Sequence, residues 1–370
     1  MAKRPGALED LALKMLFGGV YSGRNILVTG HTGFKGSWLC LWLMALGARV
    51  SGLALDPDTD PAHWSLLSLH AVSDKRLDLR DRTAVRRAID EIRPEIIFHL
   101  AAQPLVRRSY REPLLTFETN VLGLVHLLDA VRGVDSAEVL INVTSDKVYR
   151  ERSTASGYLE DDPLGGHDPY STSKACSELV TESYHKSFFG ESGPRVATVR
   201  AGNVIGGGDW SEDRLVPDFV RAASTGAVLH IRNPDAVRPW QHVLEPLSGY
   251  LRLGQLLLSG AAVEGAWNFG PAIEATISVK ELVAHMQTLW PELRSQHDPG
   301  PHPREAPILL LDSTKAARGL QWRPVWNVTE TLRHTIWWYH SYYRRGKLRS
   351  HGDLDNYVAA AAEAGLEWAK

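Results

Sequence analysis

Five polar side chains in two short runs of the sequence are of the kinds that move protons and hydride. Ser145, Asp146 and Lys147 follow the apolar run VLINV directly, which predicts a strand with a polar tip. The later run DPYSTSK opens a predicted helix, on which Tyr170 and Lys174 share one face because they are four residues apart. A hydroxyl, a carboxyl, a phenol and two amines at one edge of a sheet suit redox and proton-transfer chemistry.

The Tyr-x-x-x-Lys spacing is common by itself, and the sequence contains it twice. The second copy, Tyr343–Lys347, follows the run IWWYHSYY of a predicted closing helix, and no hydroxyl at a strand end precedes it. We expect no catalysis there. The first copy comes one strand-to-helix step after Ser145, so a parallel sheet can bring these side chains together. The alternative for the first copy is a pair on the surface of a helix.

A glycine-rich turn lies between the apolar run 26–29 and the helix-like run SWLCLWLMALGA. Strand, glycine turn and helix in this order are the setting of a dinucleotide-binding turn, in which the backbone and the helix N-terminus approach the diphosphate closely. The expected dinucleotide contacts in this turn are Gly30, Thr32, Gly33, Phe34 and Gly36.

Further cofactor contacts are expected at the ends of the following strands. Asp56 ends the predicted strand 49–55, where a carboxylate binds the adenosine ribose and repels a 2′-phosphate, which favours NAD over NADP. A turn-forming aspartate is the alternative. The remaining expected contacts are Asp78 and Leu79 at the end of a third strand, Ala101 and Ala102 after a fourth, and Tyr170 and Lys174. Lys174 and the positive nicotinamide would lower the pKa of Tyr170 towards neutrality, so that Tyr170 removes a proton from a sugar hydroxyl.

The alternation of strands and helices predicts an α/β fold: a Rossmann-like, doubly wound parallel sheet with a smaller, mixed C-terminal substrate lobe. We divide the chain into an N-terminal extension (1–22), a NAD-binding domain (23–202), a mainly substrate-binding lobe (203–345) and a peripheral C-terminal tail (346–370). Arginines in the second half suit a nucleotide diphosphate, with surface arginines as the alternative. The expected substrate contacts are Gln103, Asn120, Ser145, Asn203, Arg214, Arg232, Arg238 and Arg304. Five tryptophans are expected in the core: Trp267, Trp322, Trp326, Trp337 and Trp338.

The composition argues against several classes of protein. The 370 residues carry a formal charge of −2, which disfavours a nucleic-acid binder that works by counterion release. No apolar run approaches the ~20 residues that span a bilayer, and charges interrupt the N-terminal run where a signal peptide needs an apolar core. Cys40 and Cys176 have no metal-type neighbours, so we expect reduced thiols, no metal site and a cytoplasmic location.

Several runs resemble the motifs of the extended short-chain dehydrogenase/reductases: GHTGFKG, HLAAQ, TSDK and YSTSK. Longer runs are most similar, within that superfamily, to the CDP-glucose 4,6-dehydratases: HLAAQPLVRRSY, NVTSDKVY, RAGNVIGGGDW and IRNPDAVRPWQHVLEPLSGYL. The resemblance covers roughly residues 22–345. It implies NAD-dependent conversion of CDP-glucose to CDP-4-keto-6-deoxyglucose, by oxidation at carbon 4, loss of water across carbons 5 and 6, and return of hydride to carbon 6. It also implies a homodimer or homotetramer that pairs through helices like 113–132 and 168–189.

The resemblance gives separate roles to the residues of the first motif. Ser145 and Tyr170 would serve the hydride steps, Asp146 would protonate the leaving 6-hydroxyl, and Lys147 would take the carbon 5 proton if it is neutral. An ion pair between Asp146 and Lys147 is the alternative. Dehydratases of dTDP-glucose place Asp-Glu here, whereas the CDP-glucose branch places Asp-Lys. Residues 151–161 depart from that branch because they lack its usual tryptophans.

Two other functional interpretations stay open. One is a dehydratase or 4-epimerase that acts on another nucleotide-diphosphate sugar. The other is a protein that keeps NAD bound without turnover, against which the intact set of five polar residues argues. A simple epimerase needs no acid–base pair such as Asp146-Lys147, which favours dehydration.

Overall fold

A seven-stranded parallel sheet forms the centre of the protein, seen in a computed structural model that describes residues 13–152, 156–190, 192–272, 276–300 and 309–370. The strand order is β11-β6-β5-β4-β1-β2-β3. The strands are β1 (Asn25–Thr29), β2 (Arg49–Ala54), β3 (Ser73–Arg76), β4 (Ile96–His99), β5 (Val139–Val143), β6 (Arg195–Arg200) and β11 (Gly265–Asn268). The order reverses between β1 and β4, which is where doubly wound sheets bind ligands. The predicted fold class is confirmed.

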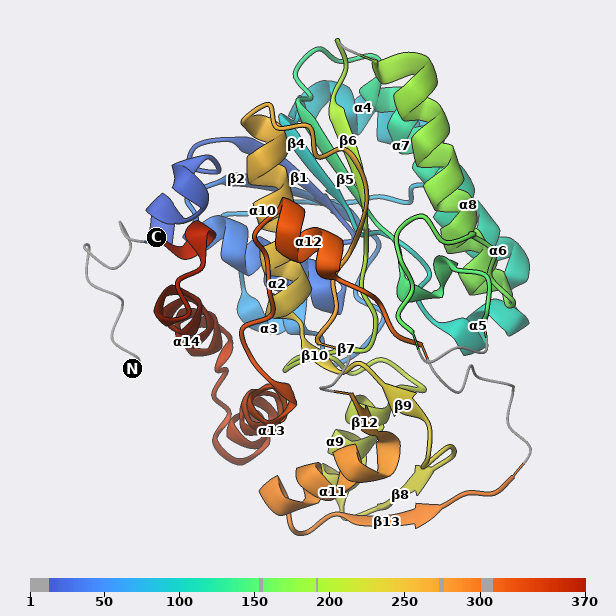
Figure 1. Cartoon of the computed structure of the whole chain (residues 1–370), viewed down its shortest axis with the longest axis vertical. Coiled ribbons are helices and arrows are strands. Elements are labelled where there is room, and N and C mark those ends of the chain that lie inside the picture. The colour runs from blue at the N-terminus through green and yellow to red at the C-terminus, as the bar shows by residue number, and fades with distance from the viewer. Residues whose placement is uncertain (1–12, 153–155, 191, 273–275, 301–308) are drawn as a thin grey trace.

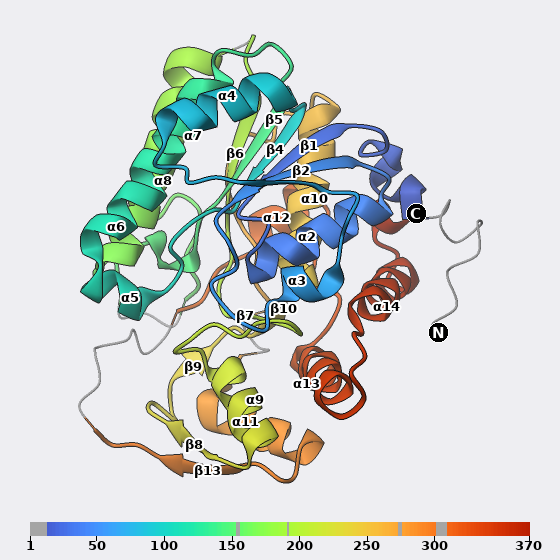
Figure 2. The same cartoon turned by 180° about the vertical axis from the view of Figure 1, so that it is seen from behind.

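Helices cover both faces of this sheet (Figures 1 and 2). One face carries α4 (Arg82–Ile92), α7 (Gly123–Val131) and α8 (Pro169–Tyr184). The other carries α2 (Phe34–Ala45), α10 (Leu244–Leu258) and α12 (Thr314–Gly319), with α3 (His63–Leu67) beside α2. Each residue of β5 is buried, as expected for a parallel strand that is covered on both faces.

The helical layer beside β4 contains one long apolar helix. After α5 (Val106–Arg111), α6 (Pro113–Phe117) runs through a π-helical turn at Glu118–Leu122 into α7. The combined helix Pro113–Val131 is long and apolar enough to cross a membrane by length and composition. It packs against α4 and α8 and so contributes to the layer that covers the sheet. Its outer side exposes Leu114 and Leu122.

A smaller lobe lies beyond the carboxyl ends of the strands (Figure 1). It contains α9 (Leu215–Thr225), α11 (Val279–Leu289) and three two-stranded sheets. The sheets pair β7 (Val204–Ile205) with β10 (Gln241–His242), β8 (Val228–Ile231) with β13 (Arg294–His297), and β9 (Val237–Arg238) with β12 (Ile277–Ser278). The alternation of strand and helix therefore breaks after β6, as expected.

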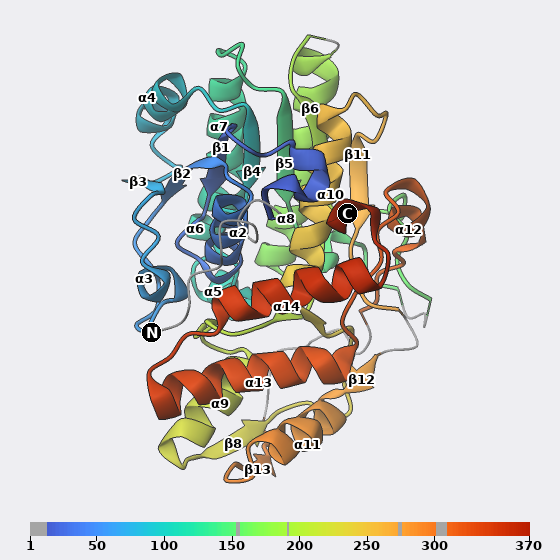
Figure 3. The same cartoon turned by 90° about the vertical axis from the view of Figure 1, so that its left-hand side faces the viewer.

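The C-terminal helices α13 (Val328–Arg345) and α14 (Ser350–Glu363) are packed into the core (Figure 3). The expectation of a peripheral tail is wrong in this respect, because Tyr357 and Trp368 are completely buried. The ring of Trp368 stacks on Phe17 with 4.9 Å between centroids. Helix α2 is the physical reason: it is buried at every residue from Gly36 to Leu43 and needs cover on its outer side.

The expectation that five tryptophans lie in the core holds for four of them. The expectation is wrong for Trp337, whose side chain is 42% exposed. The guanidinium of Arg333 lies 4.9 Å from the centre of its ring. The other four are buried.

Candidate active site

The carboxyl end of β5 places the first polar motif. The strand ends at Val143, and Ser145 caps a short 3₁₀ turn, Asp146–Val148, by accepting a hydrogen bond from the Lys147 backbone N–H at 3.2 Å. The Ser145 hydroxyl donates to Asp146 Oδ1 at 3.0 Å. Both side chains are buried, so the turn holds a hydroxyl and a carboxyl at the edge of the sheet with little freedom.

Helix α8 places the second motif against this turn. Asp168 caps the helix by accepting from the Ser171 N–H at 2.9 Å, and Pro169 occupies its first position. Lys174 Nζ donates to the carbonyl oxygen of Val143 at 3.0 Å, which ties the helix to the end of β5. Tyr170 lies one turn earlier, is buried, and shares a hydrogen bond with Ser145. The structure therefore brings the five predicted residues together, while their catalytic roles remain predictions.

Burial dominates the electrostatics of this group. Burial raises the pKa of Tyr170 to about 12, against which the hydrogen bond with Ser145 and the charge of Arg214 act. The expected lowering of the Tyr170 pKa by Lys174 and a bound nicotinamide stays a prediction, and the Lys174 ammonium is directed to the Val143 carbonyl. Burial also lowers the pKa of Lys174 to about 8, although the carboxylate of Glu178 opposes it.

Asp146 and Lys147 form the ion pair that was the alternative for a neutral Lys147. The distance between Lys147 Nζ and Asp146 Oδ1 is 3.3 Å. The Asp146 side chain is 1% exposed and the Lys147 side chain 34%, so the lysine faces the open side of the site.

Two buried polar atoms near this pair have no hydrogen-bond partner among the described residues: Asp146 Oδ2 and Asn203 Nδ2. A Cβ at Gly202 would lie 1.8 Å from Asp146 Oδ2, so only glycine fits beside this carboxylate. Asn203 adopts a left-handed backbone conformation with φ of 47°. One acceptor oxygen of Asp146 and one donor group of Asn203 are therefore left unused by the described residues.

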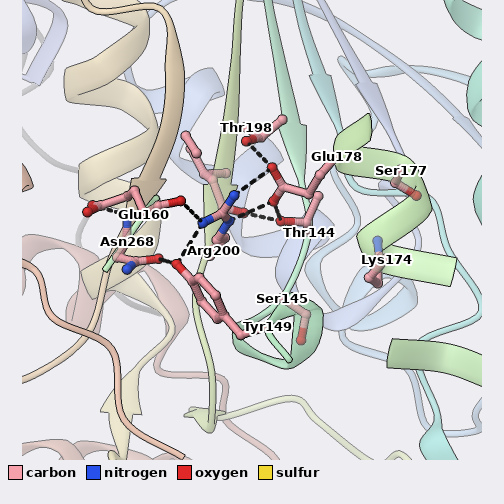
Figure 4. Close-up of polar contacts among 12 residues, drawn as sticks. Thr144, Ser145, Tyr149, Glu160, Lys174, Ser177, Glu178, Thr198, Arg200 and Asn268 are labelled. Carbon is pink, nitrogen blue, oxygen red and sulfur yellow. Dashed lines mark hydrogen bonds and ion pairs between the residues drawn. The ribbon is translucent and has the colours of Figure 1, made fainter. Parts of the chain in front are cut away.

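A buried ion pair supports the site from behind (Figure 4). Arg200 on β6 and Glu178 on α8 are joined at 2.9 Å, with 3% and 5% of their side chains exposed. Glu178 also accepts from the hydroxyl of Thr144, next to Ser145, and Arg200 donates to the hydroxyl of Tyr149 at 2.6 Å. The end of β5, helix α8 and the segment after the first motif are therefore connected by one network.

The glycine turn fits a dinucleotide. Gly30 has φ of +74°, and a Cβ there would lie 2.6 Å from the Ala101 backbone nitrogen. A Cβ at Gly36 would lie 2.2 Å from the Gly30 carbonyl oxygen. A larger residue at either position would push the turn away from strand or helix, whereas Gly33 is exposed in front of α2. The close backbone packing that a diphosphate site requires is present.

The other expected cofactor residues have varied surroundings. Thr32 donates to the Leu55 carbonyl at 3.0 Å, and Asp56 is 88% exposed with Arg76 at 3.6 Å. Asp78 follows β3 rather than ending it, and its carboxylate binds Arg80. The Leu79 side chain belongs to the core under α4 and α7. Phe34, Ala101 and Ala102 are half-buried at the ends of β1 and β4.

The expected substrate contacts have different surroundings. Arg214 lies near Tyr170 and pairs with Asp209 at 2.9 Å, close to the polar cluster. Asn120 and Gln103 are buried and bond to each other, with Asn120 Nδ2 also donating to Ser173 at 2.8 Å, so they lie one layer behind Tyr170. Arg232 pairs with Asp213, and Arg238 Nη1 donates to the Val237 carbonyl. Arg304 lies outside the described residues. Among the described residues, no group of three metal-binding side chains occurs.

Two residues near the polar cluster were not assigned a role from sequence. Lys35, inside the glycine turn, lies close enough to Lys174, Arg214 and Asp146 to feel their charges. Tyr250 on α10 approaches Lys35 at 3.3 Å. For Lys35, the sequence did contain a signal, because a lysine stands inside a closely packed glycine turn. Nothing in the sequence connects position 250 with a turn more than 200 residues earlier.

Comparisons with known proteins agree with this geometry. The chain is 46% identical over 351 residues to the CDP-glucose 4,6-dehydratase of Salmonella typhimurium, which covers 92% of this chain and 98% of that relative. It is 29% identical to a dTDP-glucose 4,6-dehydratase of Streptomyces griseus, over 86% and 94% of the two chains.

Solved structures are similar over most of the chain as well. The dTDP-glucose 4,6-dehydratase of Streptomyces venezuelae, solved with NAD bound, has a TM-score of 0.71 at 26% identity and covers 85% of this chain and 97% of its own. The UDP-glucose 4-epimerase of Thermus thermophilus, a complex with NAD, has a TM-score of 0.73 at 26% identity, over 87% and 99%. Residues 27–335 match the profile of the GDP-mannose 4,6 dehydratase family. The chain belongs to the GDP-mannose 4,6 dehydratase family.

Proposed function

We propose that the protein is a hydro-lyase that converts CDP-glucose to CDP-4-keto-6-deoxyglucose with NAD that is regenerated within each turnover. The observation that carries this proposal is the 46% identity, over nearly the whole of both chains, to a CDP-glucose 4,6-dehydratase. The buried set of Ser145, Asp146, Tyr170 and Lys174, with Lys147 at its open side, supplies the groups that the reaction needs.

The cofactor site consists of the glycine turn and the ends of β1 and β4. When bound there, NAD would supply the hydride acceptor for the oxidation at carbon 4 and the hydride donor for the reduction at carbon 6. Gly30, Gly33 and Gly36 would hold its diphosphate, and Lys174 would lie near the nicotinamide. The complexes of two relatives with NAD support this assignment.

Tyr170 would remove the proton from the 4-hydroxyl in the first step. Its hydrogen bond with Ser145 aligns the phenol, and the positive charge of Arg214 stabilises the phenolate that forms. A buried tyrosine whose pKa is raised to about 12 depends strongly on such charges.

The Asp146–Lys147 contact would supply both groups for the loss of water. Transfer of one proton from Lys147 Nζ to Asp146 Oδ1, across 3.3 Å, turns the ion pair into a carboxylic acid and a neutral amine. Asp146 then protonates the leaving 6-hydroxyl while Lys147 takes the carbon 5 proton. Because the two groups already touch, no other base is required.

A panel of nucleotide-diphosphate glucoses tests the proposal. The CDP, dTDP, UDP and GDP sugars are incubated with the enzyme and NAD, and 4-keto-6-deoxy product and net NADH are measured. We expect product from CDP-glucose without net NADH. Galactose-configured product would instead identify a 4-epimerase, product from another sugar only would change the substrate, and no product from any sugar would favour a protein without turnover.

We further propose a cytoplasmic homodimer. Leu114 on α6, Leu122 in the π-helical turn before α7 and Leu179 on α8 are 70%, 50% and 55% exposed, an apolar surface suited to a second copy of the chain. Light scattering after size-exclusion chromatography should give twice the chain mass. The double change Leu122→Glu and Leu179→Glu should give the monomer, while the same change at exposed Leu55 should leave the dimer intact.

A further inference from the structure

Lys35 is a half-buried lysine to which the proposed reaction gives no role. It stands in the first turn of α2, between Gly33 and Gly36 of the glycine turn. Its side chain turns inward: Nζ donates to the Tyr250 hydroxyl at 3.3 Å and lies 5.6 Å from the centre of that ring. Tyr250 is completely buried on α10, so the contact crosses from the first βα unit to a helix of the second half of the chain.

The charges around Lys35 are mostly of its own sign. Lys174 from α8 and Arg214 before α9 repel the ammonium, and Asp146 after β5 is the attractive group. Asp146, however, is paired with Lys147. Within the described part of the chain, Lys35 forms no ion pair with a carboxylate. Burial and these like charges lower the pKa of Lys35 to about 7.

An anion bound next to Lys35 would stabilise its ammonium, because the nearby charges of Lys174 and Arg214 repel it. The N-terminus of α2, from which Lys35 projects, is where the close packing of Gly30 and Gly36 prepares a diphosphate site. The contact of Lys35 with Tyr250 directs the side chain along the inner side of that helix rather than to solvent. A dinucleotide diphosphate would be the counter-charge that the protein itself does not supply.

We propose that Lys35 and Tyr250 are cofactor-binding residues, in which the Tyr250 hydroxyl positions the Lys35 ammonium on the diphosphate of the dinucleotide. This inference rests on the proposed function, because it assumes that NAD is the resident cofactor. It adds one charged side chain to a site that otherwise relies on backbone N–H groups. It also couples the binding of NAD to the uptake of a proton near neutral pH.

The direction of this coupling follows from the charge of the ligand. An anion raises the pKa of an ammonium, so Lys35 is about one-quarter protonated at pH 7.5 before binding and fully protonated afterwards. Binding should take up roughly 0.7 proton at this site at pH 7.5 and almost none at pH 6. NAD affinity should therefore fall as the pH rises above 7.

Calorimetric titration with NAD, in two buffers of different ionisation enthalpy, tests the inference on protein freed of nucleotide. Lys35→Met should bind NAD about 10- to 100-fold more weakly, the loss expected for one charged hydrogen bond, and should take up roughly 0.7 fewer protons than the wild type at pH 7.5. Lys35→Arg should keep the affinity and lose the proton uptake, since its charge is permanent. Tyr250→Phe should weaken the binding of NAD less than Lys35→Met does.

The outcomes separate this inference from the proposed function. Wild-type protein that does not bind NAD would refute the proposed function itself. If the wild type binds NAD and a folded Lys35→Met protein binds it equally well with unchanged proton uptake, Lys35 is not a cofactor residue. If Lys35→Met binds NAD normally but its turnover halts after reduction of the cofactor, Lys35 acts on the sugar. This result would also overturn the inference. If Lys35→Met does not fold, Lys35→Arg and Tyr250→Phe decide by the same measurements.

Discussion

The buried pair of Glu178 and Arg200 should be the most sensitive support of the site (Figure 4). Glu178 accepts four hydrogen bonds, from the hydroxyls of Thr144 and Thr198 and twice from Arg200. Glu178→Gln keeps the shape of the side chain but removes its charge and one of its two acceptor oxygens. Arg200 then remains buried without its ion-pair partner, and its acceptors are the one remaining amide oxygen of the substituted side chain, the Tyr149 hydroxyl and the Glu160 carbonyl.

The expected loss of unfolding free energy is about 3–5 kcal/mol, the usual cost when one partner of a buried ion pair is removed. This is a large fraction of the ~5–15 kcal/mol by which proteins are commonly stable. Urea unfolding at 25 °C, followed by circular dichroism, measures the loss as a lower midpoint at an unchanged slope.

Two controls frame this measurement. Arg82 and Asp129 pair at a similar distance, 3.0 Å, but Arg82 is 72% exposed, so Arg82→Ala should lose less than about 1 kcal/mol. The double change Glu178→Leu with Arg200→Met removes both charges and should lose less than Glu178→Gln alone. A Glu178→Gln protein as stable as the Arg82→Ala protein would refute the assignment of Glu178 as a charge partner that Arg200 requires.

Two further predictions concern the acid–base groups. Lys147→Ala should complete the oxidation at carbon 4 and then stop, leaving the absorbance of reduced nicotinamide on the enzyme with CDP-glucose; normal turnover would show that Lys147 is not the base. Glu245 is completely buried, accepts from the Val325 and Trp326 N–H groups, and has its pKa raised to about 7 by burial. A carboxyl whose pKa is raised in the folded state destabilises the fold as it ionises. The free energy of unfolding of Glu245→Gln, measured with urea relative to the wild type, should therefore rise by roughly 3 kcal/mol between pH 4 and pH 8. A difference between the two proteins that does not change with pH would contradict the raised pKa.

The parts of the structure that local pattern determines were predictable. The apolar run of β5, the cap and proline that open α8, and the glycine turn before α2 each depend on neighbouring residues, so the sequence indicated them. The meeting of Ser145 with Tyr170 followed as well, because parallel strands end at one edge of a sheet.

The parts that depend on distant contacts were not predictable. The raised pKa of Tyr170 reflects how deeply the smaller lobe and α8 bury the phenol, which no local run reveals. Likewise, α14 looked peripheral because its own run is rich in alanine, whereas its burial follows from the apolar outer side of α2 more than 300 residues earlier. The partners of Asn120 and Arg232 also lie far away in the sequence, and a pattern of residue types does not specify them.

The unpartnered atoms Asp146 Oδ2 and Asn203 Nδ2 have a consequence for how the sequence evolves. A buried polar group without a hydrogen bond costs about 1–3 kcal/mol of stability, and a charged one more. Relief of these unmet hydrogen bonds would favour a small apolar residue in place of Asp146 and glycine in place of Asn203, since glycine tolerates the backbone conformation of Asn203. The contacts of Asp146 Oδ1 with Ser145 and Lys147 offset part of this gain, and selection for turnover opposes both changes. In a lineage that no longer needs the reaction, these two positions should diverge before the glycines and the buried network that hold the fold.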